Sequence, residues 1–170
     1  MPKKSKTILW QRFLFICYLA LLVWIILFKL QLSFQDIDRI RTINLLPFHY
    51  DDGNNARLHL KEVAYNIAVF VPFGIYLCML TEKQKTIYNF LIILASAVGF
   101  EMMQYLLAIG SSDVTDILTN ASGGLIGIWL YSVLIKITNS REKVNRVITI
   151  LATASTILVI GGLSLLIFQN

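Results

Sequence analysis

Three carboxylic acids stand out because of the apolar sequence around them. Glu101 and Asp116 interrupt long hydrophobic segments, and Asp113 lies one helical turn before Asp116. A charged side chain at the centre of a bilayer costs on the order of 2.5–3.5 kcal/mol. Such residues must therefore face the interior of the helix bundle or a water-filled cavity, or be protonated. Carboxyl groups held together can act as general acid or base, or bind Mg²⁺ or Mn²⁺ through oxygen. These three are the candidate catalytic residues. The structural alternative is that they only form hydrogen bonds that hold neighbouring helices together.

Amide, aromatic and glycine residues accompany these acids. The candidate ligand-binding residues are Asn44, Asn66, Glu101, Gln104, Tyr105, Asp113, Asp116 and Asn120. At 100° per residue, the polar residues of 113–120 share an arc of about 100° with Gly123, Gly124 and Gly127. The GxxxG spacing of Gly123 and Gly127 predicts close helix packing. Pro72 with Gly74 predicts a kink or a packing contact, and Asp113 could instead cap a helix.

The remaining reactive side chains carry no recognisable motif. His49 and His59 lack the spacing of paired metal ligands, and Cys17 and Cys78 both fall in apolar segments as expected free thiols. We therefore expect no cofactor, and a divalent metal has no ligand motif to support it.

The composition places these residues in a membrane. Of the 170 residues, 56% are hydrophobic and 15% are charged, whereas soluble domains are about 45–50% apolar and about 25% charged. A chain this short cannot hide so much apolar surface from water. The net charge of +5 then indicates orientation rather than nucleic-acid binding.

Five segments are long enough to cross a bilayer as helices. We place them at about residues 8–28, 63–80, 86–109, 114–135 and 147–168. The first could be a cleaved signal peptide, but its apolar run is too long and no small-x-small site follows it. The sequence predicts an all-α integral membrane protein, a single domain with five spans.

Basic residues are distributed unevenly between the two sides. Ten of the fifteen Lys and Arg precede the first span, lie within its first turns, or lie between spans two and three or four and five. The positive-inside rule therefore places the N-terminus in the cytoplasm and the C-terminus outside. The polar groups of spans two to four then lie in the outer half of the membrane, with nothing comparable in the inner half.

The only long connection, residues 29–62, has an apolar residue at every third position from Phe34 to Ile43. That spacing suits an amphipathic helix at the outer interface. An ordinary structured loop is the alternative.

Four motifs resemble a known family. The letters NLLPF at 44–48 resemble the NLxPF signature of VanZ-like membrane proteins, and residues 66–74 are similar to its NxxxFxPxG segment. Residues 101–104 resemble its ExxQ element, and residues 113–124 its DxxDxxxNxxGG element. The resemblance covers about residues 44–130 and leaves the span at 147–168 as an extra one. The family often has an Arg shortly before the first Asp of the last element, which this chain lacks.

The resemblance implies a link to lowered susceptibility to teicoplanin-type glycopeptides in Gram-positive bacteria, but no defined reaction. Our first hypothesis is an outward-facing polar pocket that recognises or protects an outer-leaflet lipid or a lipid-linked cell-wall precursor, with the glycopeptide as another candidate partner. The second is a membrane-embedded, metal-assisted enzyme acting on a lipid-linked substrate. The third is a small proton-coupled transporter that uses Glu101. The expected location is the cell membrane.

Overall fold

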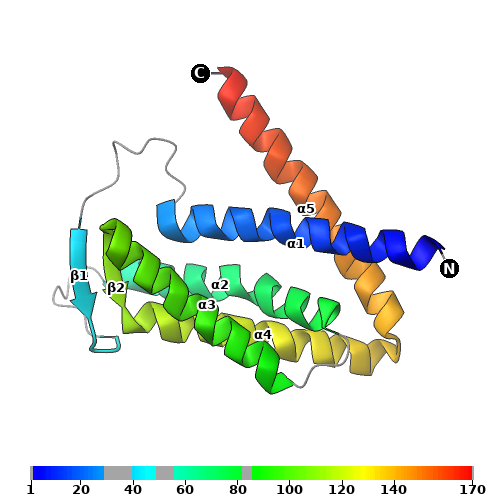
Figure 1. The fold of residues 1–170 in the computed structure, drawn as a ribbon, viewed down its shortest axis with the longest axis horizontal. Helices are drawn as coiled ribbons and strands as arrows, with labels where there is room; N and C mark the ends of the chain where they lie inside the picture. The colour runs from blue at the N-terminus through cyan, green and yellow to red at the C-terminus, as the bar shows by residue number, and fades with distance from the viewer. Residues whose placement is uncertain (1, 29–39, 49–55, 82–85, 170) are drawn as a thin grey trace. The chain divides into compact units, whose positions relative to one another are not determined.

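The computed structural model describes residues 2–28, 40–48, 56–81 and 86–169, with side chains in slightly narrower limits. Its elements, in chain order, are α1 Pro2–Phe28, β1 Ile40–Asn44, α2 Ala56–Leu80, α3 Thr86–Leu107, β2 Ile109–Asp113, α4 Val114–Thr138 and α5 Arg141–Gln169 (Figure 1). All five helices are long and apolar enough to cross a membrane. The predicted number and order of spans are therefore confirmed.

The chain divides into two compact units. The first takes residues from Met1–Leu21 and Ser132–Asn170, and in it α1 is tied to α5 by two side-chain hydrogen bonds. Trp10 Nε1 donates to Thr153 Oγ1 at 3.0 Å, and the buried Gln11 Nε2 donates to Thr149 Oγ1 at 3.0 Å. The second unit, Leu22–Tyr131, contains all the candidate site residues.

Several helix ends differ from the predicted span limits. We expected the third span to reach residue 109, but α3 ends at Leu107 because Ala108 adopts a left-handed backbone conformation, with φ of 53°, and β2 begins at Ile109. Asn139 likewise ends α4 with φ of 50°, and Asn tolerates this conformation better than most residues. Only two residues then separate α4 from α5, because Ser140 Oγ accepts the backbone N–H of Lys143 and starts α5 at once.

Two short strands, β1 and β2, form where we expected other structure. We expected an amphipathic helix or a structured loop around β1, and a turn at β2. β1 and β2 form a parallel pair in which Ile40 is opposite Ile109 and Asn44 is opposite Asp113. Figure 1 shows the pair beside the end of α3. The amphipathic-helix hypothesis is therefore wrong for residues 40–43, because pairing with β2 requires an extended backbone there. Its remaining positions lie outside the described residues.

Glycines allow α2 and α4 to pack backbone to backbone. A Cβ atom added at Gly123 would overlap the carbonyl oxygen of Ile67, and one added at Gly127 would overlap that of Val71. From the other side, a Cβ at Gly74 would overlap the carbonyl oxygen of Gly124. These glycines therefore lie at the contact between α2 and α4, and Pro72 lies inside α2 next to it. Since residues 67 and 71 are opposite 123 and 127, α2 and α4 run parallel and both begin at the sheet end.

Candidate functional site

Strand pairing brings Asn44 to Asp113. In a parallel pair, directly opposed residues project to the same face of the sheet, and Asn44 Nδ2 donates to Asp113 Oδ2 at 3.1 Å. The Asn44 Oδ1 atom accepts the backbone N–H of Leu46 at 3.1 Å, which turns the chain after β1. The two strands therefore place a loop amide against a carboxylate that follows it by 69 residues.

Asp113 also begins α4. Its Oδ1 atom accepts the backbone N–H of Thr115 at 2.7 Å, which is the bond of a helix N-cap. The sequence analysis gave helix capping as an alternative role for Asp113, and the structure shows this bond. It uses only one of the two carboxylate oxygens. Asn44 occupies the other, so both oxygens of Asp113 accept hydrogen bonds from neutral donors.

Glu101 is buried two turns before the end of α3, with a relative exposure of 2%. Its Oε2 atom accepts the backbone N–H of Asp113 at 2.8 Å, and the side chain of Ser112 is a further hydrogen-bond partner. Asp113 and Asp116 lie close enough for their charges to act on Glu101. The three predicted catalytic candidates are thus neighbours in space.

Asp116 joins α4 to α2. Its Oδ1 atom accepts a hydrogen bond from Asn66 Nδ2 at 2.7 Å. Asn120, one turn further along α4, is only 1% exposed. The close approach of α2 and α4 at their glycines makes these contacts between the two helices reachable for short side chains.

We call these joined residues the sheet-end cluster. Its members are Asn44, Asn66, Glu101, Asp113, Thr115 and Asp116.

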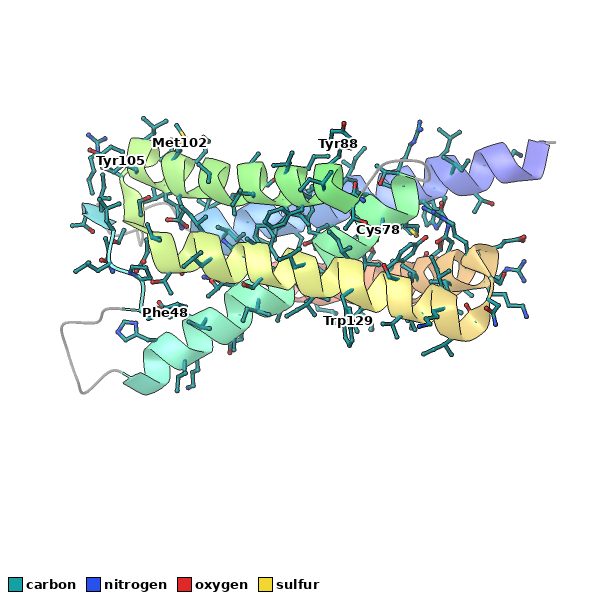
Figure 2. All side chains as sticks on the ribbon, turned by 90° about the horizontal axis from the view of Figure 1, so that it is seen from below. Phe48, Cys78, Tyr88, Met102, Tyr105 and Trp129 are labelled. Carbon is teal, nitrogen blue, oxygen red and sulfur yellow. The ribbon has the colours of Figure 1, made fainter. Side chains whose placement is uncertain are left out.

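Two predicted ligand-binding residues lie beside this cluster and have other partners. Gln104 is buried and donates from Nε2 to the carbonyl oxygen of Ile26 at 3.0 Å. The Tyr105 ring lies beneath the Arg41 guanidinium, 5.6 Å from its centroid, at the end of α3 that also carries Met102 (Figure 2). Gln104 thus satisfies the end of α1, and Tyr105 supports β1.

The sequence analysis missed two members of the site. Thr115 is 1% exposed, and its Oγ1 atom accepts the backbone N–H of Phe48 at 3.0 Å, which holds the segment after β1 over the start of α4. Ser112 is the second, through its side-chain hydrogen bond to Glu101. Neither residue type is unusual at a helix start, so no sequence signal distinguished them. His49 lies outside the described residues.

The sheet-end cluster is acidic. Among the described residues, ion pairs join His59 to Glu62 and Arg146 to Glu142, and all four residues lie outside the cluster. Across residues 2–28, 40–48, 56–81 and 86–169, no group of three or more His, Cys, Asp or Glu is placed to hold a metal ion. The metal-assisted enzyme and the proton-coupled transporter stay predictions.

Five helices long and apolar enough to span a membrane, three of which (α2, α3 and α4) carry a partly buried acidic cluster, define a polytopic membrane protein. The sequence profile described as VanZ/LLP1 matches residues 15–136. Protein VanZ of Enterococcus faecium is 34% identical to this chain over 140 residues, which is 81% of this chain and 83% of the relative. The chain belongs to the VanZ/LLP1 family. No solved structure matches it.

Proposed function

We propose that this protein acts in the cell membrane to recognise or protect an outward-facing component of the envelope, an outer-leaflet lipid headgroup or a lipid-linked cell-wall precursor. By doing so it lowers susceptibility to teicoplanin-type glycopeptides, the phenotype associated with its family. The observation that carries the proposal is the gathering of Glu101, Asp113 and Asp116 at one end of the helices.

The energetic cost of these carboxylates favours a functional role over a purely structural one. Asp113 has a structural use as the cap of α4. The hydrogen bond that Glu101 accepts from the backbone N–H of Asp113 only requires an acceptor oxygen, which Gln also offers. An amide would supply that oxygen without the cost of placing a carboxylate in a span. Keeping the acids is therefore best explained by a ligand.

The distribution of basic residues supports an outward-facing cluster. The described residues of the cluster lie at the end where α3 finishes and α4 begins (Figure 1). The connection between those two helices has no Lys or Arg, whereas the α4–α5 region carries Lys136, Arg141, Lys143 and Arg146. The positive-inside rule puts the latter region in the cytoplasm and the sheet end outside.

The orientation can be checked with single cysteines. In a background with Cys17 and Cys78 replaced by Ser, we expect Ser111→Cys to react with a membrane-impermeant maleimide in intact cells. Glu142→Cys should react only after the cells are permeabilised. The reverse labelling pattern would place the cluster on the cytoplasmic side and contradict the proposal.

The function can be tested by isosteric substitution. In a susceptible Gram-positive host, expression of the wild type should raise the minimal inhibitory concentration of teicoplanin. Glu101→Gln and Asp116→Asn should return it to the level of the empty host while the amount of membrane-inserted protein is unchanged. Glu142→Gln is the matched control, because its side chain is 85% exposed and pairs only within α5, and it should keep the resistance. Full resistance in both cluster variants would refute the proposal.

A further inference from the structure

Two side-chain amides and one backbone N–H of the sheet-end cluster donate hydrogen bonds to its carboxylates. Asn44 Nδ2 donates to Asp113 and Asn66 Nδ2 donates to Asp116. The backbone N–H of Asp113 donates to Glu101. Each of these donors is directed at a carboxylate, and the six carboxylate oxygens of Glu101, Asp113 and Asp116 outnumber the two side-chain amide nitrogens of Asn44 and Asn66.

Asn120 adds a buried acceptor with no partner. Among the described residues, its Oδ1 atom forms no hydrogen bond, and the residue is 1% exposed. Because Asn120 follows Asp116 by four residues, both lie on one face of α4. The Cα–Cβ bond of a helical residue tilts toward the helix N-terminus, which directs the Asn120 side chain toward Asp116. A buried acceptor without a partner costs about 1–3 kcal/mol. A ligand that donates a hydrogen bond to Asn120 Oδ1 would remove this cost.

Gln104 on α3 also has an amide oxygen without a partner among the described residues. Its Nε2 atom faces the Ile26 carbonyl, which lies in the last turn of α1, where carbonyl groups lack helical partners. A carbonyl can only accept, so this contact fixes which way the amide points. The Oε1 atom is left without a partner among the described residues. Both unpartnered amide atoms beside the acidic residues are therefore oxygens.

We infer that the sheet-end cluster binds a primary ammonium group, with Asn120 Oδ1 as one acceptor and the neighbouring carboxylates as counter-charge. This inference rests on the proposed function and names the ligand class of the same site. A primary ammonium brings a positive charge and three N–H donors, which complement the three carboxylates of the cluster and the acceptor oxygen of Asn120. A phosphate or carboxylate group brings neither, so the amine end of an envelope component is the part that is recognised.

The probe experiment compares headgroups of different charge and donor content. The full-length protein, purified in a non-ionic detergent, is heated while the fluorescence of its three tryptophans is followed. Dihexanoyl phosphatidylethanolamine should raise the melting temperature in a concentration-dependent way. Dihexanoyl phosphatidylglycerol should not, and dihexanoyl phosphatidylcholine, which cannot donate N–H bonds, should act at least about tenfold more weakly, a difference of about 1.4 kcal/mol.

Two further probes separate the sources of an ammonium group and an inorganic cation. Ethanolamine chloride as effective as the lipid would identify a free amine as sufficient, whereas a much weaker effect would identify an amine-bearing lipid. Either result supports the inference. Equal shifts with sodium chloride, with the choline lipid or with the glycerol lipid would overturn it, as would no shift with any amine.

Asn120→Leu distinguishes a ligand contact from a structural one. Leucine keeps the branching of asparagine at Cγ and replaces both amide atoms by methyl groups, and removing an unpartnered buried oxygen should leave the melting temperature without probe unchanged or higher. The apparent affinity for the ethanolamine lipid should fall at least about tenfold, while Glu142→Gln should keep it. A lower melting temperature with intact probe binding would show that Asn120 has a structural partner, and the inference would be wrong.

The inference and the proposed function can fail separately. If no amine binds but Glu101→Gln and Asp116→Asn abolish resistance, the ligand class is wrong and the function stands. If the amine binds and both variants keep full resistance, the site exists but does not serve the proposed function.

Discussion

The two ends of the α2–α3 pair are both polar, but they are built differently. At the end opposite the sheet, Asn89 is 3% exposed and accepts a hydrogen bond from Thr81 Oγ1 at 3.0 Å. Its Nδ2 atom donates to Cys78 Sγ at 3.5 Å, and Figure 2 shows Cys78 and Tyr88 far from Tyr105 at the sheet end. This neutral cluster is satisfied by its own members.

The difference shows what a membrane helix pair requires and what it does not. Neutral amides and hydroxyls are enough to join α2 to α3, which is the usual role of polar residues between spans. The sheet end has three carboxylates in addition, and the amide oxygen of Asn120 has no partner within the described part of the chain. We had expected nothing comparable at the opposite end, and the neutral Asn89 cluster corrects that view while leaving the acids confined to one end.

The largest effect is expected from breaking the α2–α4 contact that supports the sheet end. In Gly127→Val the new side chain would overlap the backbone of Val71, and rigid backbone cannot move aside as a side chain can. We expect a loss of about 3 kcal/mol or more, seen as aggregated or degraded protein by size-exclusion chromatography. Gly161→Val is the control, since nothing lies within 4 Å of its Cβ position, and it should behave as the wild type.

Placing an acid in the neutral cluster tests whether the two ends differ in tolerance for charge. Asn89→Asp should lower the free energy of unfolding by about 2 kcal/mol, because the carboxylate loses the amide donor to Cys78 and remains buried. Thermal unfolding in detergent measures this change. An unchanged melting temperature would mean that a buried carboxylate destabilises neither end of the α2–α3 pair. The proposed difference between the two ends would then be wrong.

Removing an acid from the sheet end should have the opposite sign. Glu101→Gln keeps an acceptor for the backbone N–H of Asp113 and removes a charge that Asp113 and Asp116 repel. We expect the melting temperature to stay equal or to rise, by about 1 kcal/mol in stability at most, while resistance is lost. A marked drop in stability would instead assign Glu101 a structural role.

The smallest effect concerns the joint between α3 and β2. Ala108 has φ of 53°, a conformation that glycine adopts without the steric cost that Ala bears. Ala108→Gly should therefore stabilise the protein by about 0.5–1 kcal/mol, measured as a higher melting temperature. Ala97→Gly is the comparison, since Ala97 is buried inside α3 and the change should destabilise by a similar amount.

Local patterns in the sequence were enough for the helices and for the faces on which the acids lie. Hydropathy over about 20 residues identifies a span, and 100° per residue places Asp116 and Asn120 on one face of α4. The glycine spacing likewise predicted a packing surface. Each of these properties depends on residues only a few turns apart.

The partners of those residues were decided by the tertiary structure. Asn44 meets Asp113 across 69 positions and Asn66 meets Asp116 across 50, and no local pattern contains that information. The apolar spacing that suited a helix at residues 40–43 was overridden, because β2 offers unpaired backbone groups that β1 can satisfy. The sequence by itself determined a membrane protein of five spans with costly acids. Only the packing of α2, α3 and α4 decided that the acids meet, because their hydrogen bonds require backbones brought together from distant parts of the chain.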